Sequence, residues 1–149
     1  DGLFRALIES GLQRTEESIK HVRQLPVSTS ERLRVLARDR YQFVRQQPKI
    51  VKLFLDLHHG PDASGLFDEF ADRMHAPINQ LSDLIREAQN NGELRSDINS
   101  TTLALAFLGT INVFVHLHFA FGYVTLDTAL ADQLVSQFVD GAAVVSVSN

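Results

Sequence analysis

One stretch of this chain restricts its fold more than any other. The 22 residues from Leu103 to Val124 carry no charged side chain, although 21% of the residues in the chain are charged. A helix of this length is long enough to cross a bilayer. However, Asn112, His116 and His118 lie within the stretch, no second such segment exists, and aromatic and basic residues do not frame it. We therefore expect no membrane span but a helix that is covered by protein on both sides.

Composition predicts one globular domain over residues 1–149. The chain is 44% hydrophobic, which suits a single core for this length. It has no cysteine, so neither a disulfide nor a thiolate metal site is expected, and it fits a reducing compartment. The first residues, DGLFRALIESGL, mix acidic and basic side chains with apolar ones, unlike a signal peptide. We therefore expect a cytoplasmic location.

Hydrophobic periodicity predicts helices along almost the whole chain. Apolar residues recur at three- and four-residue spacing, and no strand-like alternation occurs. Pro77 should kink or split the longest pattern, so we expect an all-α fold with six or seven helices. Ser28, Asp97 or Asn99, and Thr125 are the expected caps. The predicted helices cover Asp1 to Pro26, 29–47, 48–59, 62–90, 101–121 and 126–145.

The last two predicted helices have more apolar surface than one domain of this size covers. The uncharged helix is apolar on two sides, and the final helix is apolar over more than half its circumference, leaving Asp132, Ser136 and Asp140 as a polar strip. A symmetric partner would cover the second side of each helix. We therefore expect a homodimer held together by a four-helix bundle. The expected interface residues are Leu108, Asn112, Val115, Phe119, Leu134 and Phe138.

Aromatic side chains gather on three of the predicted helices. The apolar sides of 48–59, 62–90 and the uncharged helix exceed what their mutual packing needs, which favours a pocket among them, although such residues are individually more often plain core. Few polar groups lie on these faces, so we expect a flat or elongated, largely apolar ligand that is neutral or anionic. The expected ligand-binding residues are Phe54, Leu57, His58, Phe70, Met74, Ile78, Phe107, Thr110, Ile111, Phe114 and His118.

The sequence lacks the motifs of common enzyme classes. Its eight glycines form neither a phosphate-binding loop nor a dinucleotide fingerprint, and no G-x-S-x-G or H-E-x-x-H segment is present. Asp56 with His59, and Asp72 with His75, place a carboxylate and an imidazole one helical turn apart, a spacing that di-iron helical bundles use with glutamate. Both pairs fall on or beside polar faces. We therefore expect no enzyme, no metal site and no cofactor.

Charge is distributed unevenly along the chain. The net charge is -4, but residues 1–52 hold 11 Lys and Arg against 6 Asp and Glu. An acidic chain is a poor general ligand for nucleic acid, so we expect no DNA binding by this chain itself. The basic residues of the first part fall mostly where solvated helix faces belong. These residues include Arg34, Arg38, Arg45, Lys49 and Lys52.

Three segments resemble the tetracycline-repressor-type (TetR) family of transcriptional regulators. DGLFRALIESGL is similar to the start of the family's first ligand-domain helix, NNGELRSDINSTTLALAFLGTIN (90–112) to the connection into its penultimate helix, and LADQLVSQFVDGA (130–142) to its final helix. The resemblance implies an effector-binding and dimerisation domain that reaches DNA only through an N-terminal helix-turn-helix upstream of this sequence. Two other interpretations remain open, namely a metal-binding helical bundle and a dimeric interaction domain without a cavity.

Overall fold

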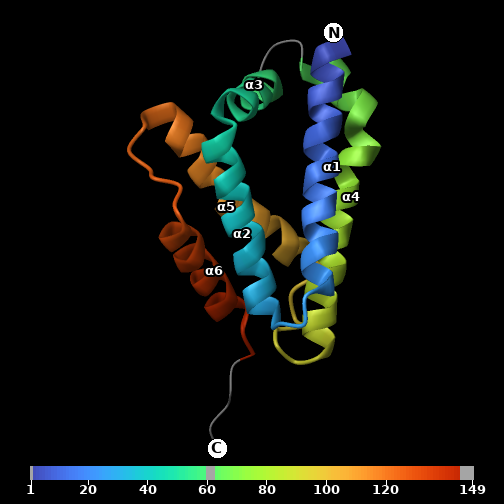
Figure 1. The fold of residues 1–149 in the computed structure, drawn as a ribbon. Coiled ribbons are helices and arrows are strands. Elements are labelled where there is room, and N and C mark those ends of the chain that lie inside the picture. Colours follow the sequence, from blue (N-terminus) through green and yellow to red (C-terminus); the bar gives the residue numbers. More distant parts are fainter. Residues whose placement is uncertain (1, 60–62, 145–149) are drawn as a thin grey trace, which may run out of the picture.

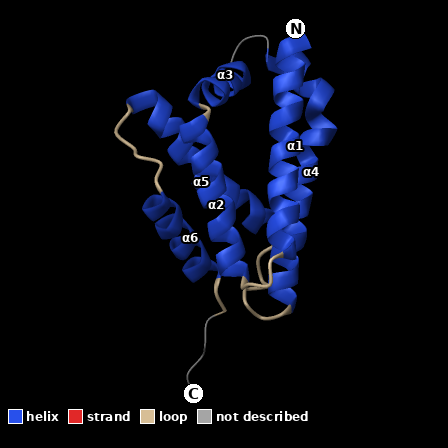
Figure 2. Ribbon diagram, in the orientation of Figure 1, coloured by secondary structure: helices blue, strands red, loops and turns tan. Residues whose placement is uncertain are grey.

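The described part of the chain is all-helical. The structure is a computed structural model, and it describes residues 2–59 and 63–144 without the side chains of 57–59, 63, 64, 66 and 67. Within these ranges no strand is formed (Figure 2), and an isolated bridge joins Leu94 to Ala143. The all-α prediction is therefore confirmed. The helices described are α1 (Gly2–Gln24), α2 (Thr29–Gln46), α3 (Pro48–His59), α4 (Ala63–Asn90), α5 (Ser100–Phe121) and α6 (Thr128–Ala142).

Helices α1 and α4 form one side of the molecule, and α2 and α3 lie opposite them (Figure 1). Helices α1 and α4 lie side by side, α6 packs on α2, and α5 packs against α4 and α6. The start of α1 and α3 lie at one end of the molecule, and the end of α6 lies toward the other (Figure 1).

Most helix ends lie where the sequence predicts them. The Ser28 side chain accepts a hydrogen bond from the Glu31 amide, and that of Asn99 accepts from the amides of Thr101 and Thr102. Gly92 and Gly122 adopt positive φ angles of 84° and 71° at the ends of α4 and α5. Short polar side chains and glycines thus satisfy the backbone groups that each helix end leaves unpaired.

Two predicted boundaries need correction. Helix α6 begins at Thr128 and is capped by Asp127, whose Oδ1 accepts from the Leu130 amide at 2.8 Å, so Thr125 is not the cap. The predicted end of this helix, Val145, lies outside the described residues. Pro77 does not split α4, which is continuous across it. Of the two outcomes predicted at this proline, the split is therefore wrong, and the kink stays a prediction.

Two hydrophobic clusters form the core. The larger contains Leu33, Tyr41, Leu81 and Ile85, and the smaller contains Ile8, Leu12 and Phe70. Tyr41 joins α2 to α5, because its hydroxyl donates a hydrogen bond to the Ile111 carbonyl oxygen at 2.9 Å. Burial raises the pKa of Tyr41 to about 12, so this phenol is protonated at neutral pH. The hydrogen bond therefore holds α2 at a fixed distance from α5.

Helix α5 is buried on one side within the chain. Its buried stripe is Leu103, Ala104, Phe107, Ile111 and Val115. Among the described helices, α5 is the one that is long and apolar enough to cross a membrane. Of its apolar 18-residue stretch, 28% is buried within the protein. A core helix of a soluble protein meets the same criterion of length and composition. One such helix is weak evidence for a membrane span, and the buried stripe makes α5 part of the core.

An ion pair joins α2 to α6. Arg38 donates from Nε and Nη2 to the two carboxylate oxygens of Asp132 at 2.7 and 2.8 Å. Arg45 also bonds across this contact, from Nη1 to the Leu126 carbonyl oxygen. The predicted solvated face of α2 and the predicted polar strip of the last helix therefore partly face each other. Complementary charge explains why two polar surfaces pack together.

This pair should make stability dependent on pH in acid. The Arg38 hydrogen bond, as the largest cause, lowers the pKa of Asp132 below its ordinary value of 3.8. A depressed carboxyl pKa contributes stability above the unfolded value, and the contribution is lost as pH falls through the folded value. Both side chains are more than a third exposed (38% and 35%), so Asp132→Asn should cost no more than about 1 kcal/mol at pH 7.

Urea unfolding at pH 7 and below about pH 4 measures this effect, because the ordinary aspartate pKa lies near 3.9. The difference between the wild type and Asp132→Asn should shrink in acid. The exposed Asp140 on the same helix supplies the control Asp140→Asn, which should show no such pH dependence. Equal behaviour of the two variants would show that the pair contributes nothing.

Candidate ligand-binding cavity

A cavity of about 770 Å³ lies between α1, α2, α3, α4 and α5. Its volume falls in the range of sites that bind small molecules. The wall includes residues of both hydrophobic clusters, among them Leu12, Met74 and Phe107. The cavity therefore occupies the space between the two clusters, and α3 covers the end nearest the N-terminus (Figure 1).

Most of the wall is apolar. Every one of the five helices contributes aliphatic or aromatic side chains to it. Close packing of these groups would ordinarily exclude a void of this size, because interiors are packed as densely as organic crystals. An apolar ligand would regain the contacts that the empty wall lacks. The apolar lining consists of Leu7, Leu12, Ile19, Leu36, Ala37, Phe43, Ile50, Val51, Phe54, Met74, Pro77, Ile78, Leu81, Phe107, Leu108 and Ile111.

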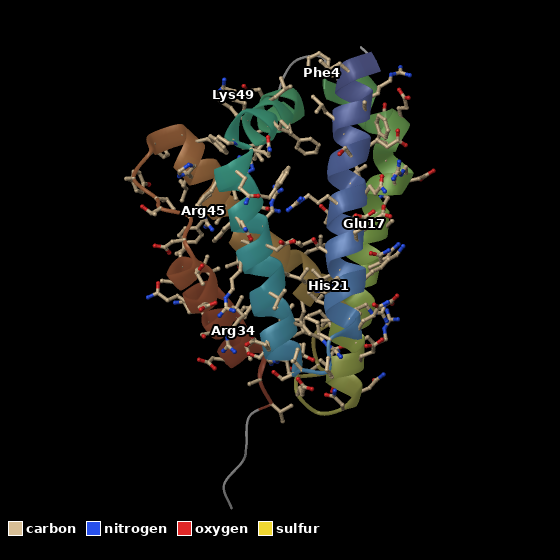
Figure 3. The ribbon with its side chains drawn as sticks, in the orientation of Figure 1. Phe4, Glu17, His21, Arg34, Arg45 and Lys49 are labelled. Carbon is tan, nitrogen blue, oxygen red and sulfur yellow. The ribbon has the colours of Figure 1, made fainter. Side chains whose placement is uncertain are left out.

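Most of the polar part of the wall lies on α1 and α2, and Asn112 of α5 adds to it. Ser18 of α1 donates from Oγ to Asp39 Oδ2 of α2 at 2.6 Å. Glu17, which is labelled on α1 in Figure 3, accepts a hydrogen bond from Gln13 Nε2 at 2.9 Å. The guanidinium of Arg14 lies 4.5 Å from the centre of the Phe43 ring. Because Gln13, Arg14 and Glu17 are exposed, this edge of the cavity meets solvent.

Arg40 differs from the other polar residues of the wall. Burial lowers the pKa of its guanidinium from the ordinary 12.5, which still leaves it charged at neutral pH. Among the described residues it has no carboxylate within ion-pair distance and no hydrogen-bond acceptor. Its neighbour Asp39 is bonded to Ser18, and adjacent helix residues do not face each other. The cavity wall therefore carries one half-buried positive charge without a protein partner among the described residues.

The structure brings five of the predicted ligand-binding residues together on this wall. These are Phe54, Met74, Ile78, Phe107 and Ile111. Phe70 lies beside the cavity instead, packed with Ile8 and Leu12 in the smaller cluster. Leu57 and His58 belong to α3, but their side chains lie outside the described residues.

Three predicted lining residues of α5 are not on the cavity wall. Thr110 donates from Oγ1 to the Ala106 carbonyl oxygen at 2.8 Å, and His118 Nδ1 lies 2.6 Å from the Val124 carbonyl oxygen. Phe114 lines a separate hollow between α5 and α6, together with Leu130 and Leu134. Phe114 therefore lies on the side of α5 that is turned to α6. The sequence shows two apolar sides of this helix but not which neighbour each side contacts.

The expected interface residues are largely buried within the chain. Leu108 and Asn112 line the cavity, and Val115 and Leu134 are only 1% and 6% exposed. Phe138 packs edge-on against Phe107, with ring centres 5.4 Å apart. Phe119 packs edge-on against His118.

The face of α5 that is exposed in the subunit lies about a quarter turn around the helix axis from the face predicted to form the interface, since successive residues are 100° apart. Leu105 and Val113 on this face are 49% and 47% exposed. Thr102, Ala106, Gly109 and Ala120 are exposed beside them. Val115 and Leu134 therefore belong to the subunit interior, whereas the other four predicted interface residues are half-buried, and the uncovered apolar surface of α5 lies next to them.

Sequence reasoning missed the contribution of α1 and α2 to the cavity. Leu36, Arg40, Phe43 and Gln47 follow one another at helical spacing along one face of α2, and all line the wall. Their mixture of charged and apolar residues resembles an ordinary surface face. The signal available in the sequence was the helical spacing of Leu36 and Phe43. These two residues lie beside the buried stripe of α2 and widen the apolar side of this helix.

The predicted absence of a metal site concerns residues that are only partly described. Asp72 and His75 are exposed, and Lys52 Nζ lies 2.8 Å from an Asp56 carboxylate oxygen. The side chain of His59 lies outside the described residues. Among the side chains that are described, no group of three or more His, Cys, Asp or Glu residues is placed to hold a metal ion.

Comparisons with known proteins identify the fold. No protein-family model matches the sequence, and no curated protein matches it. A solved structure of a protein with unknown function from Rhodococcus sp. RHA1 is similar, with a TM-score of 0.75 and 19% sequence identity. The match covers 95% of this chain and 72% of the Rhodococcus chain. At this identity the similarity shows the fold alone.

Proposed function

We propose that this chain is the ligand-sensing and dimerisation domain of a TetR-type transcriptional regulator. It binds a small, largely apolar molecule, and binding modulates the affinity of the full-length protein for its operator. The observation that carries the proposal is the cavity of about 770 Å³ within one subunit. The resemblance of three sequence segments to the TetR family supplies the regulatory context.

The position of α1 supports a coupling between the cavity and a preceding DNA-binding module. Residues Leu7 to Ile19 of this helix line the cavity over about three turns. A ligand that prefers one position of α1 relative to α2 and α4 shifts the population toward that position. Because α1 is the first helix, its position sets the orientation of any module attached before it. The coupling is then a difference in ligand affinity between two helix arrangements.

The exposed face of α5 supports dimerisation. Leu105 and Val113 lie on a charge-free side of this helix, and contiguous apolar surface on a subunit marks an interaction site. The outer face of α6 is more polar, with Gln133 and Gln137 exposed. We therefore place the centre of the dimer interface on α5, with α6 flanking it in a four-helix bundle.

Native mass spectrometry and thermal unfolding test the sensing function. The protein should either carry a small molecule after purification or be stabilised by apolar compounds in a screen. A ligand at 100 times its Kd adds about 2.7 kcal/mol, which corresponds to a rise of about 5 to 10 °C in Tm for a domain of this size. A protein that carries nothing, and that no screened compound stabilises, would contradict the proposal.

A further inference from the structure

The charged side chains on the cavity wall have partners within the protein, with one exception, whereas the uncharged side chain of Asn112 on the α5 wall has none among the described residues. Asp39 accepts from Ser18, Glu17 accepts from Gln13, and Arg14 lies over the Phe43 ring. Thr15 donates from Oγ1 to the Gly11 carbonyl oxygen at 3.0 Å. Arg40 has no such partner among the described residues. A half-buried charge without a partner costs free energy, so a folded protein ordinarily supplies one.

The surroundings of Arg40 define what a partner must look like. On its own helix Leu36 and Phe43 lie one turn away on the same face, and both line the cavity. The other walls present Met74 and Ile78 of α4 and the α5 stripe that contains Phe107. A molecule that fills this space therefore meets the guanidinium of Arg40, a largely apolar wall and the amide of Asn112.

We propose that the ligand is an amphipathic monocarboxylate, with its head group on Arg40 and its apolar body against α4 and α5. This inference rests on the proposed sensing function of the cavity. A guanidinium offers two parallel N–H donors that match the two oxygens of a carboxylate. One arginine neutralises one charge, which favours a singly charged head over a phosphate ester. A cationic head group placed beside Arg40 would be repelled by the guanidinium.

Matched pairs of amphiphiles test the proposal by isothermal titration calorimetry below their micellar concentrations. The probes are dodecanoate and 1-dodecanol, and the flat pair 2-naphthoate and 2-naphthol, with dodecyl phosphate and dodecyltrimethylammonium as further head groups. At least one carboxylate should bind the wild type about tenfold to one hundredfold more tightly than its alcohol, as a hydrogen bond to a charged group predicts.

Arg40→Gln should remove this preference and leave the alcohol affinity unchanged. Arg40→Lys keeps the charge but loses the planar donor pair, so its preference should be intermediate. Arg34→Gln is the control, because Arg34 lies on the same helix outside the cavity and pairs with Glu31. The unliganded Arg40→Gln protein should melt at the wild-type temperature or above it, because a half-buried unpaired charge has been removed.

The outcomes separate the two proposals. If the alcohols bind as tightly as the carboxylates, or if dodecyl phosphate or the cation binds best, the carboxylate inference is overturned while ligand sensing stands. The same conclusion follows if Arg34→Gln loses the preference as much as Arg40→Gln does. If no probe of either pair binds, both the inference and the sensing function are contradicted. A lower Tm of unliganded Arg40→Gln than of Arg40→Lys would show that the charge stabilises the fold, which also overturns the inference.

Discussion

Val113→Glu should convert the protein from a dimer to a monomer. Val113 is 47% exposed in the subunit and lies on the charge-free face of α5, which we place at the centre of the interface. In a symmetric dimer each substitution buries two carboxylates without counter-charges, which costs several kcal/mol. Sedimentation should give about twice 16.7 kDa for the wild type and a single subunit mass for the variant.

Because Val113 is exposed, its replacement should not perturb the core of the subunit. Circular dichroism should therefore give the same helix content for the variant and the wild type. Leu3→Glu is the control, because Leu3 is 72% exposed on α1, away from the proposed interface, and its replacement should leave the dimer intact. A wild type that sediments as a monomer, or a Val113→Glu protein that stays dimeric, would refute the interface. Leu134→Glu is a poorer test, since Leu134 is 6% exposed and its charge would disrupt the subunit itself.

Gly11→Trp should abolish ligand binding without destabilising the fold. Gly11 lies on α1 at the cavity wall, and a Cβ atom added there meets no neighbouring atom within 4 Å. The indole would then occupy ligand space, and the affinity for the compound that most stabilises the wild type should fall by more than about tenfold, equivalent to 1.4 kcal/mol. Insertion of such a side chain into a close-packed core would instead cost about 1 to 3 kcal/mol of stability.

Gly11→Ala is the matched control for this substitution. It removes the same helix-interior glycine, which should raise stability by about 0.5 to 1 kcal/mol, but adds only one methyl group to the cavity. Ligand affinity should remain near the wild-type value. Urea unfolding and calorimetry measure the two quantities separately. Equal affinities of the Ala and Trp variants would mean that the ligand does not occupy this cavity.

The sequence predicts helix positions well because their signals are local. The capping side chains of Ser28 and Asn99 and the stop at Gly122 need only neighbouring residues to act, and the structure places all three as expected. The start of α6 was predicted too early because Thr125 and Asp127 are both suitable caps, and only the chain path selects Asp127.

The arrangement of helix faces was harder to predict, because it depends on residues far apart in the chain. Phe107 and Ile111 were correctly grouped with Phe54, Met74 and Ile78, since all lie near the centres of apolar faces. In contrast, α5 is apolar on all sides, so its periodicity does not specify which residues meet α6, the cavity or solvent. Arg40 was not singled out from the sequence, because a sequence does not reveal that a charge lacks a partner.

Helix α5 belongs both to the cavity wall and to the exposed face of the subunit. Phe107 and Ile111 line the cavity, while Gly109 and Val113, within one turn of them, lie on the exposed face. The helix is a rigid body held to α2 through Tyr41, so a ligand that displaces the cavity side also displaces the outer side. In the proposed dimer the outer sides of two such helices are in contact. A path only two helices long would then join the two sites of the proposed dimer, and we expect binding at the two sites to be cooperative.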